Sequence, residues 1–75
     1  MVELHVNYQE NTNGYAAICE EIPRFLVAYT GDWESFKNYI EESIDFYHQW
    51  EKERKEESIL DDGYNINFKQ MNHDN

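Results

Sequence analysis

Residues 31–47, GDWESFKNYIEESIDFY, decide the fold of this 75-residue chain because they specify one long amphipathic helix. Gly31 ends the segment before it, and the Asp32 carboxylate is suited to accept hydrogen bonds from the free N–H groups of a first helical turn. The apolar side chains that follow are three or four positions apart and so share one face: Trp33, Phe36, Ile40, Ile44 and Tyr47. This spacing predicts a helix from Trp33 to about Glu57 that packs against a sheet.

Three strands are predicted before the helix. Apolar and polar residues alternate from Val2 to Tyr8, which is the two-residue period of a strand with one buried face. Asn13-Gly14 then predicts a tight hairpin turn, and Tyr15 to Glu20 forms the second strand. Pro23 interrupts the pattern because proline has no N–H for a ladder. The third strand follows at 25–30.

One more strand is predicted after the helix. Asp61-Asp62-Gly63 favours a turn, and the alternation from Tyr64 to Lys69 indicates a short fourth strand. The fold class is therefore α+β with the order β-β-β-α-β. Strand three is parallel to strand one, so the helix returns the chain and places strand four beside strand one, in the spatial order 3-2-1-4.

This arrangement is a three-stranded antiparallel sheet with a fourth strand parallel to strand one and a helix on one face. We expect 1–70 to form a single domain, since a chain of this size supports one core, and 71–75 to form a flexible tail. The other face of the sheet, with Glu3, His5 and Asn7, is predicted to be uncovered.

Composition narrows the classes of function. Six Lys and Arg residues against sixteen Asp and Glu residues give a formal net charge of −10, which repels nucleic acid and anionic membranes. Cys19 is the only cysteine, so there is no internal disulfide, which fits a reducing cytoplasm. No apolar run approaches the roughly 20 residues of a membrane-spanning helix. We expect a cytoplasmic protein without direct nucleic-acid or membrane binding.

The sequence also argues against catalysis, metal binding and cofactor binding. Its three glycines are isolated, so there is no phosphate-binding loop. The histidines, His5, His48 and His73, have no spacing typical of a catalytic triad. His48 has Asp45 and Glu51 three positions away on either side, but no second histidine joins them in a metal site. We expect no catalytic residue, no metal ligand and no cofactor.

Several short motifs occur in this order of elements. They are Asn13-Gly14-Tyr15 with Ala17, Glu21-Ile22-Pro23, Gly31-Asp32, Ile40-Glu41-Glu42-Ser43-Ile44 and the closing 64–69. Together they resemble the HicB antitoxin family, whose N-terminal domain has a partial RNase H-like fold. Glu20 stands where that family usually has proline, and Arg24 stands where it usually has glycine. Many members continue into a DNA-binding module, so the resemblance is to the toxin-binding half without that module.

The resemblance implies a protein partner similar to the HicA toxin, a small basic ribonuclease that cleaves mRNA. A HicB-like domain neutralises such a toxin by surface complementarity and by covering its active site, and acidic residues suit a basic RNA-binding surface. The predicted partner-binding residues are Glu10, Glu20, Glu21, Glu34, Glu41, Glu42 and Asp45. The alternative for each of these carboxylates is a solvated surface position that keeps the protein soluble. RNase H chemistry needs a carboxylate cluster, but strand one offers only Glu3, so we expect no enzyme.

The helix has more aromatic surface than one sheet needs. Tyr39, Phe46 and Trp50 lie beside the main apolar stripe and widen it. Either they form a homodimer interface or they pack under the final strand and its loop. Two other functions therefore remain open: a stand-alone homo-oligomeric structural domain, and an acidic nucleic-acid mimic that inhibits another enzyme.

Overall fold

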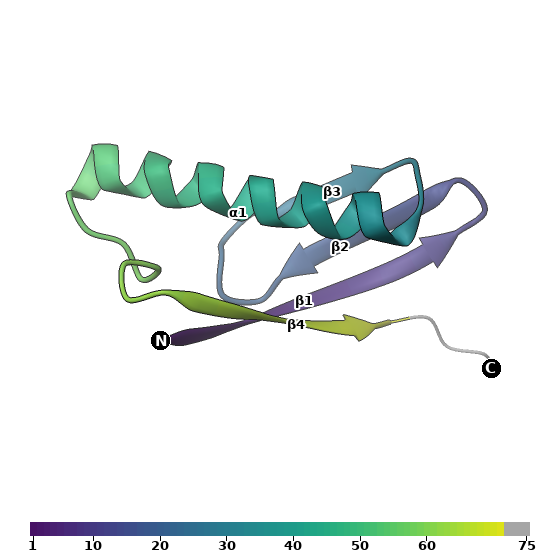
Figure 1. Cartoon of the computed structure of the whole chain (residues 1–75), viewed down its shortest axis with the longest axis horizontal. Coiled ribbons are helices and arrows are strands. Elements are labelled where there is room, and N and C mark those ends of the chain that lie inside the picture. Colours follow the sequence, from purple (N-terminus) through teal and green to yellow (C-terminus); the bar gives the residue numbers. More distant parts are fainter. Residues whose placement is uncertain (72–75) are drawn as a thin grey trace.

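The computed structural model describes residues 1–71 and contains four strands and one helix. They are β1 (Val2–Asn11), β2 (Gly14–Cys19), β3 (Leu26–Tyr29), α1 (Trp33–Lys55) and β4 (Tyr64–Gln70). The sheet order is β3-β2-β1-β4; β1 pairs antiparallel with β2 and parallel with β4, and β3 pairs antiparallel with β2. α1 crosses one face of this sheet (Figure 1). The predicted fold class and strand order are confirmed.

Met71, the first residue of the predicted tail, still pairs with β1. The backbone N–H of Met71 donates to the carbonyl of Tyr8 at 2.7 Å, so pairing between β4 and β1 continues to this residue. The rest of the predicted tail, 72–75, lies outside the described residues.

Both ends of α1 are capped as the local sequence requires. Asp32 Oδ1 accepts a hydrogen bond from the Ser35 N–H at 2.8 Å, as predicted for an N-cap. At the other end Glu56 has a φ of 63°, and its N–H donates to the Lys52 carbonyl at 2.9 Å, which ends the helix at Lys55. No helix within residues 1–71 is long and apolar enough to cross a membrane.

The hairpin between β1 and β2 forms one residue earlier than predicted. Its two turn residues are Thr12 and Asn13, and Gly14 already pairs with Asn11 as the first residue of β2. Asn11 Oδ1 accepts hydrogen bonds from the N–H groups of Asn13 and Gly14, both at 2.9 Å. The Asn11 side chain therefore closes a turn that does not use positive φ at Thr12 or Asn13.

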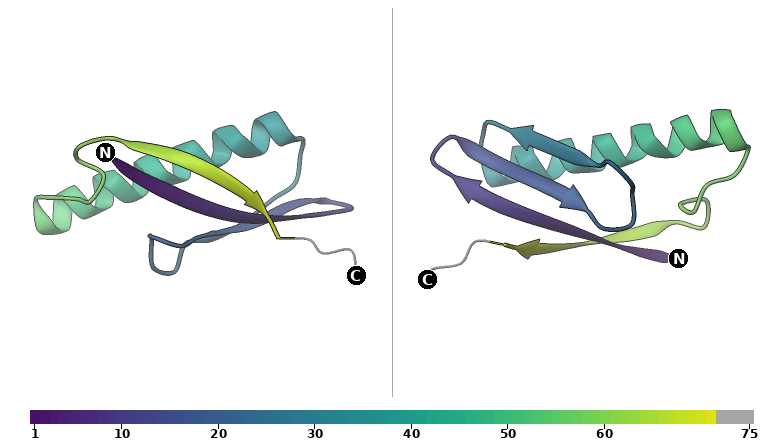
Figure 2. Two further views of the ribbon diagram at one scale, coloured as in Figure 1. Left: turned by 90° about the horizontal axis from the view of Figure 1, so that it is seen from below. Right: turned by 180° about the vertical axis from the view of Figure 1, so that it is seen from behind.

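The hydrophobic core lies between α1 and the covered face of the sheet. Its buried members are Leu4 and Val6 from β1, Ala17 and Cys19 from β2, Phe36, Ile40 and Ile44 from α1, and Ile22 and Leu60 from loops. The other face of the sheet has no layer over it in the described chain (Figure 2). This face carries the alternate residues of β1, beginning with Glu3 and His5, so the predicted uncovered face is confirmed.

Candidate functional site

Three of the seven predicted partner-binding carboxylates lie together on α1. Glu34, Glu41 and Asp45 are seven and four positions apart, so they share one side of the helix. Asp45 Oδ1 accepts a hydrogen bond from the Tyr64 hydroxyl at 2.9 Å, which shows that this side is the one nearer β4. All three residues are exposed. We call this set the acidic ridge.

The ridge remains predominantly negative despite local contacts. Lys37 Nζ lies 3.2 Å from Glu34 Oε2 and compensates one charge in part. Partial burial, the hydrogen bond to Asp45 and the nearby charge of Glu41 raise the pKa of Tyr64 to about 12, so this tyrosine stays neutral. Among the described residues, Lys37 is the one cation that forms an ion pair with a ridge carboxylate, and Lys52, seven positions after Asp45, is paired with Asp61 instead.

Glu20 and Glu21 lie at the end of β2, where they contact β1 on the uncovered face. Glu21 accepts hydrogen bonds from the His5 backbone N–H at 2.7 Å, and its other oxygen lies 2.6 Å from His5 Nδ1. Glu20 Oε2 accepts from the Asn7 side-chain amide at 2.8 Å. One possible ligand atom from each of His5, Glu20 and Glu21 lies within 4.8 Å of the others, which is a spacing compatible with a cation. The His5 ring and Glu21 are paired with each other, however, and the Glu20 carboxylate is bonded to Asn7. These carboxylates hold the β2–β3 loop to β1.

The His5–Glu21 pair makes stability depend on pH. The hydrogen bond to Glu21 raises the pKa of His5 above 6.5, although partial desolvation opposes this. Partial burial opposes ionisation of Glu21, but hydrogen bonds from the His5 N–H and ring outweigh it and lower the pKa of that carboxyl. The folded state therefore holds the proton of the His5 ring more tightly than the unfolded state does.

We expect His5→Gln to lose stability relative to the parent chain mainly at acidic pH. The contribution of the protonated ring is fully present below pH 6.5, the pKa of an unperturbed histidine, and disappears as the pH rises through the raised folded-state pKa. Thermal melts between about pH 5 and 9 measure this difference. A gap between the two melting temperatures that is constant across this range would contradict the prediction.

The remaining two predicted carboxylates lie apart from both sets. Glu10 is exposed near the β1–β2 hairpin, and Glu42 lines a groove on the opposite side of α1 from the ridge. The seven carboxylates therefore do not form one site. The structure divides them among the ridge, the β2–β3 loop, the hairpin and the groove.

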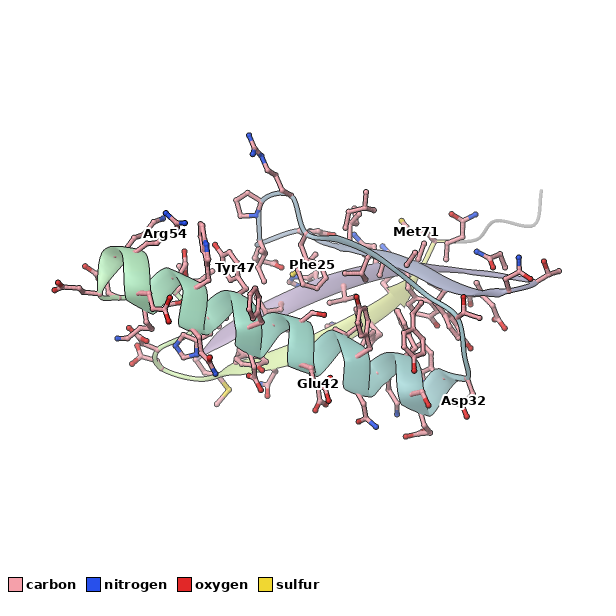
Figure 3. The ribbon with its side chains drawn as sticks, turned by 90° about the horizontal axis from the view of Figure 1, so that it is seen from above. Phe25, Asp32, Glu42, Tyr47, Arg54 and Met71 are labelled. Carbon is pink, nitrogen blue, oxygen red and sulfur yellow. The ribbon has the colours of Figure 1, made fainter. Side chains whose placement is uncertain are left out.

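This groove lies between α1 and the chain that leads into β3, and its volume is about 580 Å³. Arg24 and Glu42 are the charged residues in its lining. Most of the other lining side chains are apolar or aromatic: Ile22, Pro23, Phe25, Leu26, Val27, Phe46, Tyr47 and Trp50. Figure 3 shows Tyr47 and Arg54 on the side of α1 that faces the loop carrying Phe25. A surface of this kind suits an apolar partner.

The three extra helix aromatics do not pack under β4 and its loop. Tyr39 stacks on Tyr29 of β3, with ring centroids 5.0 Å apart. Trp50 stacks on Tyr47 at 5.9 Å and borders the groove. Phe46 also borders the groove, and 71% of its surface is exposed. The packing alternative is therefore wrong, and these side chains face the β3 side of the molecule.

Glu51 is a buried carboxylate that was not predicted from the sequence. Only 5% of its surface is exposed, and its carboxylate accepts hydrogen bonds from Ser58 Oγ at 2.6 Å and the Tyr47 hydroxyl at 2.9 Å. Lys55 Nζ, one helical turn further along α1, lies 3.7 Å from Glu51 Oε2. The hydrogen bond from Ser58 is the main influence that lowers the pKa of Glu51. This carboxylate anchors the loop between α1 and β4 and is unavailable to a partner.

His48 is held in a similar way. Its Nε2 lies 2.9 Å from Asp61 Oδ1, and Lys52 Nζ lies 3.2 Å from the other oxygen of that carboxylate. The hydrogen bond from His48, followed by that from the Ser58 N–H, lowers the pKa of Asp61 to about 2. The partner of His48 is thus a loop residue and not one of the helix carboxylates three positions away.

No protein-family model, curated protein or solved structure matches the chain.

Proposed function

We propose that this chain is a cytoplasmic HicB-like antitoxin domain that binds and neutralises a small basic HicA-like ribonuclease. The observation that carries the proposal is the charge: sixteen acidic against six basic residues in 75, with three exposed carboxylates aligned on the acidic ridge. A domain of this charge attracts a cationic RNA-binding surface and competes with phosphate for it. The docked domain then covers the active site of the ribonuclease.

Two features of the chain support the resemblance to HicB proteins. The element order β-β-β-α-β with sheet order β3-β2-β1-β4 is that of a partial RNase H-like domain. Arg24, which stands where HicB proteins usually have glycine, has a φ of 65°. This is the left-handed region that glycine adopts most readily. A glycine would adopt the backbone conformation at this position without strain.

The proposed role is binding and not catalysis. RNase H chemistry uses a group of carboxylates from the central strands to hold two metal ions. On β1 the corresponding uncovered face offers Glu3, whose carboxylate accepts a hydrogen bond from the Asn67 amide at 3.1 Å. The neighbouring Glu21 is bound to His5. These contacts support a binding role, because Glu3 and Glu21 are engaged in hydrogen bonds to other strands and loops.

The test is a binding titration against the product of the adjacent gene, which we expect to be a small basic ribonuclease, together with an mRNA-cleavage assay. We expect a complex that weakens as salt is raised and that abolishes cleavage. The double variant Glu34→Lys/Glu41→Lys reverses two of the three charges of the acidic ridge. We expect this variant to bind the ribonuclease about tenfold more weakly. We expect most of this loss of affinity to come from a slower association rate, because surface charges act on the encounter of the two proteins.

The matched control is Glu53→Lys/Glu57→Lys, at two exposed carboxylates outside the predicted partner-binding residues. Both double variants change the net charge from −10 to −6, because each reversal adds two charges to the formal value. If the two variants weaken binding equally, total charge and not the ridge determines affinity. If the parent chain binds no basic ribonuclease even at low salt, or inhibits only a different class of nucleic-acid enzyme, the proposed function is wrong.

A further inference from the structure

The two arginines of the chain differ from most of its lysines because neither is paired with a carboxylate. Lys37, Lys52 and Lys55 each form an ion pair with an acidic residue. Within residues 1–71, neither Arg24 nor Arg54 forms such a pair, although the chain has sixteen acidic residues and only six cations. The positive charge of these two side chains is therefore available to an anion from outside the chain.

Both arginines lie toward one end of the groove. α1 runs antiparallel to β3, so the later residues of α1 lie beside the chain that precedes β3 (Figure 1). Arg24 and Trp50 both line the groove, and the Arg54 guanidinium carbon lies 4.7 Å from the centre of the Trp50 ring. Glu42, the one anion in the lining, is about two helical turns before Trp50. The groove therefore has its cations at one end and its anion at the other.

The backbone at Arg24 supports a role for its side chain. Its φ of 65° lies in the left-handed region, where any residue with a Cβ atom is strained and glycine is not. The side chain is exposed, and within residues 1–71 it forms no hydrogen bond or ion pair that would offset this strain. Backbone strain that no internal contact explains is concentrated at binding and active sites.

The space between the two ends of the groove is apolar and has the size of a small-molecule site. Phe46 is 71% exposed and Trp50 is 40% exposed, and both line the groove together with the half-buried Phe25. The volume of about 580 Å³ is within the range of roughly 300–1000 Å³ that ligand sites occupy. The eight helix positions from Glu42 to Trp50 span about 12 Å, which an extended acyl chain of medium length can follow.

We propose that this groove binds a small amphipathic carboxylate, of which a medium-chain fatty acid is the simplest example. The carboxylate accepts hydrogen bonds from the guanidinium groups of Arg24 and Arg54, which are suited to two parallel bonds each. The apolar chain lies against Phe46 and Trp50 and removes their exposed surface from water. Repulsion by Glu42 at the other end fixes the orientation of the ligand.

The net charge of −10 is compatible with an anionic ligand at this place. The screening length at physiological salt is about 8 Å, so guanidinium groups in direct contact with the ligand outweigh more distant carboxylates. The acidic ridge also lies on the opposite side of α1 from the groove. The inference therefore goes beyond the proposed function, because the small ligand and the basic ribonuclease use different surfaces of the domain.

A titration of the full chain with decanoate, below the concentration at which decanoate forms micelles, tests the proposal. Amide chemical shifts measured by NMR report both the affinity and the location of binding. We expect saturable shifts at 22–27 and on the groove side of α1, with a Kd below about 1 mM. Decanol has the same chain length without the charge, and we expect it to bind at least about tenfold more weakly.

The double variant Arg24→Gly/Arg54→Gln removes both cations, and glycine relieves the backbone strain at the first position, so we expect an intact fold by circular dichroism. Its affinity for decanoate should fall at least about tenfold. The matched control is Lys37→Gln/Lys69→Gln, which changes the net charge equally, from −10 to −12, at residues outside the groove lining. We expect this control to bind decanoate like the parent chain.

Four results would overturn the proposal. They are a parent chain without saturable shifts, shifts confined to surfaces outside the groove, equal binding of decanol and decanoate, and a folded arginine double variant that binds decanoate as tightly as the parent chain. An equal loss of affinity in the lysine control would also overturn it, because total charge and not the two arginines would then determine binding.

Discussion

Phe36→Ala is expected to lower the free energy of unfolding by about 3–5 kcal/mol, which is a large part of the total for a small domain. Phe36 has no exposed surface and lies at the centre of an aromatic cluster. Its ring stacks on Tyr15 at 4.7 Å and lies 6.3 Å from Phe68, so it connects α1 to β2 and β4. Truncation leaves a cavity that these large, rigid rings cannot fill by small movements.

The measurement is chemical denaturation monitored by circular dichroism. Phe46→Ala is the matched control, because the same substitution is made on the same helix at a residue that is 71% exposed. We expect the control to change stability by less than about 0.5 kcal/mol. Comparable losses for the two variants would mean that the core is not centred on Phe36.

Gly14→Ala is the second substitution with a large expected effect. A Cβ atom at this position would lie 2.0 Å from the carbonyl oxygen of Tyr29 and 2.8 Å from the Cα of Thr30. Both are backbone atoms, so the start of β2 and the end of β3 would have to separate. Gly14 also has a φ of 152°, where side chains are strained. We expect a loss of about 2–5 kcal/mol in the free energy of unfolding.

Gly63→Ala separates the two causes of that loss. Gly63 has a φ of 91°, but a Cβ there would meet no atom within 4 Å. We therefore expect only the conformational cost, about 1 kcal/mol. If Gly14→Ala is no more destabilising than Gly63→Ala in the same denaturation experiment, β2 and β3 do not approach each other at Gly14 as closely as in this structure.

The fold was predictable because its signals are local. A strand repeats every two residues and a helix every 3.6, so alternation in β1 and the spacing of the helix residues identify each element without knowledge of its neighbours. The Asp32 cap and the break at Pro23 are equally local. Sheet order then followed from strand directions and the single helical connection. The hairpin turn was misplaced by one residue because the Asn11 side chain, and not the Asn13-Gly14 backbone, closes it.

The candidate site was less predictable because its parts are distant in the sequence. The carboxylates of the acidic ridge could be aligned from helix geometry alone. Glu21, in contrast, is bound to a histidine 16 residues away, and Glu51 is buried by a loop that bonds to it through Ser58. Neither contact has a local signature, so both carboxylates resemble ordinary surface residues in the sequence.

The amino-acid sequence by itself determined the identity and order of the elements and the strongly acidic character of the surface, since both depend on residue type and on spacing within one element. Only the tertiary structure decided which carboxylates remain exposed and where apolar surface is left uncovered. The groove exists because residues 22–27 and the far side of α1 approach each other. Such approaches depend on how loops close over the core, and no local period encodes them.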